Sequence, residues 1–150
     1  MFILAVTLLT APCNSHPQYA LQPVISYGSV AHAGAVYRAS AHLRFRLVEK
    51  TPALIPSVDP GLLDHVQGHY IIARRVAQSS TGTVQATGNT AAQARVRLRQ
   101  AIERMTSDSQ NELLREEHVY ESVTENGAAQ SQGPQYGFPG GPDARETCAQ

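Results

Sequence analysis

The clearest strand pattern in the chain lies between Ser40 and Glu49. Apolar and polar side chains alternate there, and the apolar set consists of Ala41, Leu43, Phe45 and Leu47. A period of two is typical of a strand with one buried face. Upstream, segments 24–27 and 35–37 predict two short strands, separated by Gly28 and Gly34. Downstream, the prolines of segment 51–59 predict a loop.

After this loop the apolar period becomes helical. Asp59-Pro60 supplies an N-cap followed by a proline at the first helical position, so we predict a helix from Gly61 to Gln78. Segment 83–86 predicts a further short strand. Thr90 and Gln93 then form a capping-box pair that starts a second helix. This helix either breaks at Ser107 or runs to about Tyr120, and its expected inward residues are Val96, Leu98, Ile102 and Met105.

These elements predict an α+β fold in which a small antiparallel sheet packs on the first helix, with a long second helix behind it. At 150 residues the chain is long enough for one domain with its own core. We expect that domain to span residues 14–127. Residues 128–150 are rich in Gly, Pro, Gln and Ser, so this tail is either flexible or laid over the domain as a strap.

Residues 1–13 resemble a signal segment. Met1 to Ala11 is a short apolar run, too short to span a bilayer, and it ends in a small residue. The alternatives are a buried N-terminal strand, or a start codon placed inside a longer signal. We therefore expect a secreted or periplasmic protein with no stable membrane insertion. Cys13 and Cys148 lie near opposite ends of the chain. An oxidising compartment would favour a disulfide between them, but the presence of two cysteines does not require one.

The charge balance argues against a nucleic-acid partner. Net charge is zero, with eleven arginines and the single lysine Lys50 supplying all the positive charge. The second helix carries four of the arginines: Arg95, Arg97, Arg99 and Arg104. Such a stripe can track a phosphate backbone, but this helix also carries Glu103 and lacks aromatic side chains there. A solvated face paired with Glu112, Glu116 and Glu117 is the favoured interpretation.

His65 and His69 are the candidate metal ligands. Residues four apart on a helix share a face, so both imidazoles can reach one metal ion, as in the His-Glu-x-x-His helix of zinc proteases. The alternative is a pair of surface or core histidines with ordinary hydrogen bonds. Gly68 lies between them, and glycine inside a helix costs about 1 kcal/mol relative to alanine. We therefore expect another backbone to approach closely at Gly68.

This helix resembles that of a bacterial family of uncharacterised secreted proteins predicted to be zinc-dependent proteases. The family helix reads Leu-Leu-x-His-Glu-Gln-Gly-His-Phe-x-Ile-Ala, and this chain reads LLDHVQGHYIIA from Leu62. The family's second landmark, Tyr-Asp-x-x-Thr-x-His-Gly, is matched by YESVTENG from Tyr120 to Gly127. The resemblance runs from about Ser40 to Gly127. It implies a zincin-like fold, a zinc cofactor held by His65 and His69, and a peptide or protein substrate.

The chain departs from the family at two functional positions. The resemblance places the general base at Val66, which cannot transfer a proton, and the third ligand at Asn126, which is a poor zinc ligand. We therefore expect a secreted zinc-metalloprotease-like protein that is catalytically impaired, with no catalytic residue assigned and zinc held weakly or lost. The alternative is a non-catalytic secreted or envelope binding module that retains the fold.

Two residues near the second landmark could restore a three-ligand site. His118 and Glu121 are close to Asn126 in the sequence, and either would serve if it faced the two imidazoles. For His118 a solvated position beside Glu116 and Glu117 is the favoured interpretation. The remaining histidines have no spacing that recruits them to a site: His16, His32 and His42.

Overall fold

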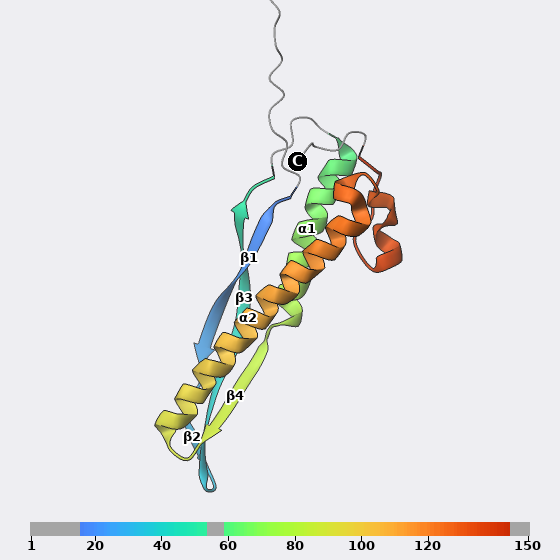
Figure 1. The fold of residues 1–150 in the computed structure, drawn as a ribbon. Coiled ribbons are helices and arrows are strands. Elements are labelled where there is room, and N and C mark those ends of the chain that lie inside the picture. Colours follow the sequence, from blue (N-terminus) through green and yellow to red (C-terminus); the bar gives the residue numbers. More distant parts are fainter. Residues whose placement is uncertain (1–15, 54–58, 145–150) are drawn as a thin grey trace, which may run out of the picture.

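The computed structural model describes residues 16–53 and 59–144. It contains an antiparallel sheet of four strands with two helices on one face (Figure 1). The strands are β1 (Gln18–Tyr27), β2 (Ala31–Ala33), β3 (Val36–Thr51) and β4 (Gly82–Gly88). The helices are α1 (Pro60–Ser79) and α2 (Ala91–Thr124), followed by the short 3-10 helices η1 (Glu125–Gly127) and η2 (Gln130–Tyr136). The predicted α+β class with a small antiparallel sheet is confirmed.

Strand β3 is the centre of the sheet. It pairs with β1 along one edge, with β2 at its tip, and with β4 along the other edge. The strand predicted over Ser40–Glu49 is therefore only the middle of a longer one, because pairing on both sides extends it. Segments 24–27 and 35–37 belong to β1 and to the start of β3. Gly34, with φ of 64°, makes the turn between β2 and β3.

The alternating pattern in β3 sets which face is buried. Ala41 and Leu43 are buried against α2, and Phe45 and Leu47 pack partly buried further along the same face. The intervening side chains are exposed on the other face: His42, Arg44 and Arg46. One side of the sheet thus makes the core and the other faces solvent, as period-two patterning predicts.

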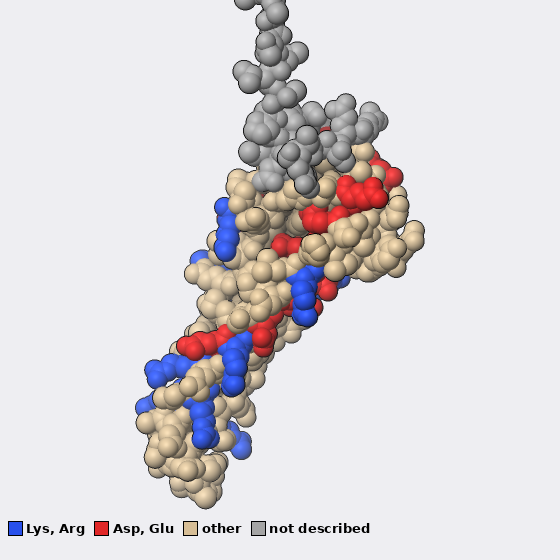
Figure 2. Space-filling model, viewed as in Figure 1, with Lys and Arg blue, Asp and Glu red and all other residues tan. Residues whose placement is uncertain are grey.

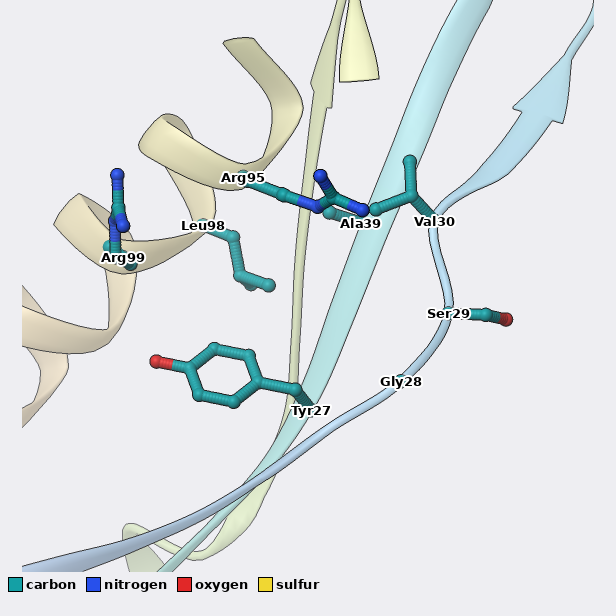
Figure 3. Close-up of a pocket in the computed structure, with 8 residues that line it drawn as sticks. All are labelled: Tyr27, Gly28, Ser29, Val30, Ala39, Arg95, Leu98 and Arg99. Atoms are coloured by element: carbon teal, nitrogen blue, oxygen red, sulfur yellow. The ribbon is translucent and has the colours of Figure 1, made fainter. Parts of the chain in front are cut away.

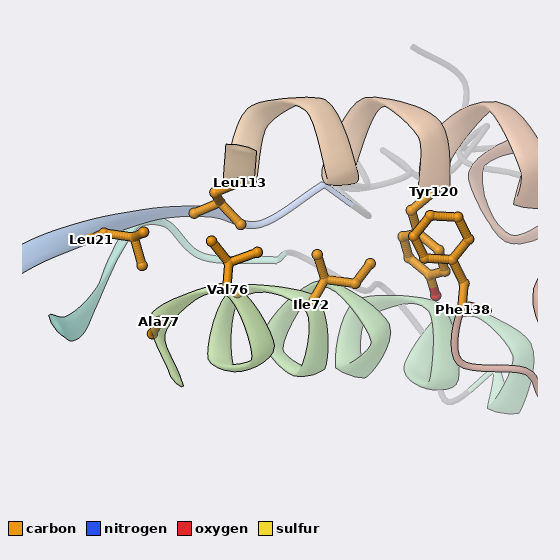
Figure 4. Close-up of a cluster of buried hydrophobic side chains, with 8 residues drawn as sticks. Leu21, Ile72, Val76, Ala77, Leu113, Tyr120 and Phe138 are labelled. Carbon is orange, nitrogen blue, oxygen red and sulfur yellow. The ribbon is translucent and has the colours of Figure 1, made fainter. Parts of the chain in front are cut away.

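The core near the end of α2 joins strands, both helices and the tail. Figure 4 shows Leu21 of β1, Ile72 and Val76 of α1, and Leu113 and Tyr120 of α2 in one cluster. Phe138, from the segment after η2, packs beside Tyr120 with ring centroids 5.6 Å apart. This cluster holds α1 and α2 side by side, which fixes the relative position of the residues they carry.

Both helices begin as the caps predict. The Asp59 carboxylate accepts from the Gly61 amide at 2.8 Å, and the Thr90 hydroxyl accepts from the Gln93 amide at 3.1 Å. Helix α2 does not break at Ser107 but continues to Thr124. It ends where Glu125 and Asn126 adopt left-handed backbone angles.

Two details of the expected packing are wrong. Helix α2 does not lie behind α1; it packs directly on β3 and β4, because Leu98 and Ile102 face the sheet there. Val96 is 42 % exposed rather than inward. Its position, two residues before Leu98, is on the opposite side of the helix from the buried stripe.

The described part of the tail lies over the helices. Residues 128–144 include η2, and the Ala144 amide donates to the Gly127 carbonyl at 2.9 Å. The proposed signal segment 1–13, residues 54–58 of the predicted loop, and Cys13 and Cys148 lie outside the described residues. Neither of the long helices combines the length and apolar content that crossing a membrane requires, among the residues the structure describes.

Candidate metal centre

His65 and His69 lie side by side on the face of α1 that meets α2. Their side chains are buried, and the ring centroids are 5.0 Å apart. The predicted arrangement on one helical face is therefore present. Burial of two imidazoles requires polar partners, since an unpaired buried polar group is costly. Those partners come from three other parts of the chain.

Glu121 of α2 contacts both imidazoles. Its Oε1 atom lies 2.5 Å from Nε2 of His69 and 3.4 Å from Nε2 of His65. His16, two residues before β1 begins, reaches the same oxygen with Nδ1 at 2.7 Å. The cluster thus joins the beginning of β1 to both helices.

The four side chains could hold a metal ion. One ligand atom from each of His16, His65, His69 and Glu121 lies within 4.8 Å of every other. Despite the short distances, Nε2 of His65 and Nε2 of His69 do not make hydrogen bonds of acceptable geometry, and neither does Oε2 of Glu121, within the described part of the chain. Buried polar atoms without hydrogen bonds need an explanation. A shared cation between them supplies one.

The donor set fits zinc in type, and the distances from the imidazoles to the carboxylate are near those of a tetrahedral site. Zinc prefers imidazole nitrogen and carboxylate oxygen at about 2.0–2.2 Å, so two ligands on one tetrahedral ion are about 3.3 Å apart. The separation of His65 Nε2 from Glu121 Oε1 is 3.4 Å. The carboxylate lies closer than that to His16 and His69, and a shift of under about 1 Å would open those two distances to the tetrahedral value.

The other nitrogen of His65 is held by buried side chains. Nδ1 lies 3.1 Å from Oε1 of Gln130 and 3.3 Å from the hydroxyl of Thr124. The Thr124 hydroxyl donates to the Tyr120 carbonyl at 2.8 Å, so it is also able to accept. With a metal ion bound, a proton on Nδ1 would satisfy this arrangement and leave the lone pair of Nε2 to coordinate the ion. Partners of this kind orient metal-bound histidines and fix their tautomer.

Gln130 is oriented in turn by a closed network. Its Nε2 donates to the Tyr120 hydroxyl at 2.8 Å and to the Pro139 carbonyl at 3.0 Å. The Tyr120 hydroxyl donates to the backbone carbonyl of His65 at 3.1 Å. Burial raises the pKa of Tyr120 well above its usual value, so this hydroxyl remains a donor. The tail is therefore connected to the candidate metal centre through a buried glutamine.

His69 has a carboxylate on its far side. Nδ1 lies 3.9 Å from Oε1 of Glu117, an oxygen that makes no hydrogen bond within the described residues. Burial on its own lowers the pKa of His69, but the contacts with Glu117 and Glu121 outweigh it and raise the pKa. A carboxylate behind a ligating imidazole is a recurrent feature of zinc sites.

Glu121 is held as a carboxylate. Burial on its own raises the pKa of Glu121, but the contacts with His65 and His69 and the charge on His69 hold it far below its usual range. A deprotonated carboxylate is the form that coordinates a metal ion. A metal ion would therefore compete with a proton on His69, whose charge helps to hold Glu121 ionised, and not with a proton on Glu121.

Gly68 allows Tyr120 to enter the centre. A Cβ atom at Gly68 would overlap the hydroxyl and Cζ of Tyr120. The close approach expected at this glycine is therefore present, but a side chain makes it rather than a backbone. The Tyr120 ring stacks on His65, with centroids 5.0 Å apart and an interplanar angle of 12°.

The segment from Thr124 to Gly127 contacts His65 on the side away from Glu121. Thr124 is near Nδ1, and a Cβ at Gly127 would lie 3.3 Å from the His65 Cβ. Asn126 is half-buried in this turn and makes no hydrogen bond to either imidazole. The side chain of this landmark that meets the two histidines is Glu121, at the position of the family's aspartate.

Three other candidates are placed by the structure. Val66 is half-buried, and its side chain has no group that transfers protons. His118 is exposed, as the solvated interpretation predicts. The interpretation of His16 as an unrecruited histidine is wrong: strand pairing brings it to Glu121, 105 residues away in the sequence. No local spacing signals such a contact.

The chain was compared with known protein families, with curated proteins and with solved structures, and none of the three comparisons gives a match. The geometry of His16, His65, His69 and Glu121 is therefore the basis for a functional conclusion.

Proposed function

We propose that this chain is an exported, zinc-metalloprotease-like protein that binds zinc but is impaired as a peptidase. The observation that carries the proposal is the convergence of three imidazoles and one carboxylate within 4.8 Å of one another. Among redox-inactive metal ions, zinc is the one that best suits a site of several imidazole nitrogens and one carboxylate. The resemblance of the α1 sequence to the zinc-protease helix supports the same metal.

The number of protein ligands supports a structural role for the ion. Catalytic zinc sites have three protein ligands and one open position, whereas structural sites have four. Here His16 supplies a fourth donor beside His65, His69 and Glu121. Val66 occupies the position of the general base in the resembling family, so this chain lacks that proton-transfer group. A non-catalytic exported module whose zinc joins the beginning of β1 to both helices accounts for both features.

Metal content tests the proposal. The purified full chain, loaded with zinc and then desalted, is expected to retain one equivalent by inductively coupled plasma mass spectrometry. His69→Ala breaks the histidine pair on α1 and leaves Glu121 with one fewer partner, so retention after desalting should fall well below one equivalent. His118→Ala is the matched control, because His118 is exposed on α2, and it should retain one equivalent. Equal retention by both variants would exclude this site.

A peptidase assay tests the impairment. Zinc-loaded protein is expected to release no peptides from casein above the rate of His69→Ala. Val66 cannot accept a proton from water, and in the proposed site His16 would fill the fourth ligand position, which a catalytic zinc keeps open for water or substrate. Peptide release by the wild-type chain that disappears in His69→Ala would show instead that the centre is catalytically active.

Gln130→Leu is expected to lower zinc affinity by about 10–100-fold, the usual effect of losing a residue that orients a metal ligand. The substitution removes the acceptor from Nδ1 of His65 and leaves the Tyr120 hydroxyl with one fewer donor. Competition with a chromophoric chelator measures the affinity. Gln130→Glu keeps an acceptor for Nδ1 but places a second carboxylate oxygen beside the Pro139 carbonyl, so it should recover only part of the loss. Exposed Gln132→Leu should change nothing. If Gln130→Glu binds no better than Gln130→Leu, then Gln130 does not act through His65.

A further inference from the structure

A hollow of about 330 Å³ lies at the other end of the sheet from the metal centre. It is enclosed by the end of β1 and the loop after it, by β3, and by the first turns of α2 (Figure 3). Strand β1 runs from the metal centre to this hollow, about 30 Å for its ten residues at 3.4 Å per residue. The two sites are therefore independent.

The inside of the hollow is apolar. Leu98 and Ala39 are almost completely buried at its base. Tyr27 forms a wall, and its side chain is 60 % exposed although it adjoins that apolar base. In Figure 3 the side chains of Leu98 and Tyr27 point toward each other across the space. An apolar hollow of this size beside an exposed aromatic ring is typical of a small-molecule site.

Two arginines border the hollow. Arg95 and Arg99 are one turn apart on α2, and in Figure 3 Arg95 extends across the hollow toward Val30. Within residues 16–53 and 59–144 neither arginine forms an ion pair. The sequence predicts that the arginine stripe of α2 pairs with Glu112, Glu116 and Glu117, and this prediction is wrong for the described residues. Those glutamates have other partners: Glu112 pairs with Arg115, Glu116 with Arg75, and Glu117 lies beside His69.

The surface charge is divided along the molecule. Figure 2 shows Lys and Arg gathered over the end that carries β2 and the start of α2, and Asp and Glu gathered toward the opposite end. The surroundings of the hollow therefore carry more positive than negative charge, with Glu103 as the nearest acidic position along α2. A small anion entering the hollow would be attracted by Arg95 and Arg99, which pair with no acidic group of the described residues.

We propose that this hollow binds a small organic anion with an apolar body. The body lies against Leu98, Ala39 and the Tyr27 ring, and a carboxylate or sulfonate group is held by Arg95. Arg99, whose side chain is directed away from Leu98 and Tyr27 in Figure 3, adds positive charge at the rim. Guanidinium groups make charge-assisted hydrogen bonds to such oxyanions. The apolar base distinguishes this site from one for inorganic phosphate, which would gain nothing from it.

Fluorescence titration of the full chain with 8-anilinonaphthalene-1-sulfonate tests the proposal. Binding should saturate at one probe per chain, and Arg95→Gln/Arg99→Gln should weaken it at least tenfold. The neutral analogue N-phenyl-1-naphthylamine should bind the wild type and this variant equally. Tyr27→Ser should weaken both probes, because it removes a wall of the hollow.

Arg97→Gln/Arg104→Gln is the matched control, since it removes the same charge from exposed positions of α2 outside the hollow. It should leave the affinity for the sulfonate within a factor of two or three. Three results would overturn the proposal: no saturable binding, an unchanged affinity in Arg95→Gln/Arg99→Gln, or an equal loss in the control. Zinc content is expected to be the same in all four proteins, so the test is independent of the metal centre.

Discussion

Zinc is expected to raise the melting temperature of the metal-free protein by roughly 8–16 °C. A ligand present at 1,000 times its dissociation constant stabilises the native state by about 4 kcal/mol. For a domain of this size, 1 kcal/mol corresponds to about 2–4 °C. We expect a large effect because the ligands come from separate elements: His16 from the segment just before β1, His65 from α1 and Glu121 from α2. One ion therefore links three elements that are far apart in the sequence.

Differential scanning calorimetry with zinc and with a chelator measures this shift. Glu121→Gln should abolish it, because a neutral amide replaces the carboxylate that all three imidazoles contact. His118→Ala should show the full shift. His16→Ala should keep a smaller one, since three ligands remain. An equal shift in Glu121→Gln and wild type would show that zinc stabilises the chain at some other place.

Gly68→Ala is expected to destabilise the protein by about 1–5 kcal/mol. In an exposed helix the same change would stabilise by about 1 kcal/mol, so the sign itself is informative. The added methyl group overlaps the hydroxyl of Tyr120, and overpacking typically costs about 1–3 kcal/mol. Tyr120 cannot retreat without losing its hydrogen bonds to Gln130 and to the His65 carbonyl, which adds about 1–3 kcal/mol.

Urea unfolding gives the free energy for this comparison. Gly82→Ala is the control, because no atom lies within 4 Å of a Cβ placed there. Combining Gly68→Ala with Tyr120→Phe should cost less than the sum of the two single changes, since removing the hydroxyl removes the closest overlapping atom. A neutral or stabilising Gly68→Ala would mean that Tyr120 does not occupy the position described.

Several parts of the metal centre are predictable from short-range pattern. Asp59 and Pro60 set the start of α1, and a four-residue spacing puts His65 and His69 on one face. Glu121 is a weaker case. The sequence offers both Glu121 and His118 as candidates around the second landmark, and only the packing of α2 against α1 distinguishes Glu121 from the exposed His118.

The features of the proposed centre therefore fall into two groups, according to how far apart in the sequence the contacting residues lie. Local sequence alone determined the histidine pair, the helix starts and the buried face of β3, because caps and side-chain periodicity act over a few residues. The tertiary structure decided that His16 reaches Glu121 and that Gln130 supports His65. Those contacts span 105 and 65 residues, and they exist because strand pairing and a shared core bring distant segments together, which no local pattern encodes.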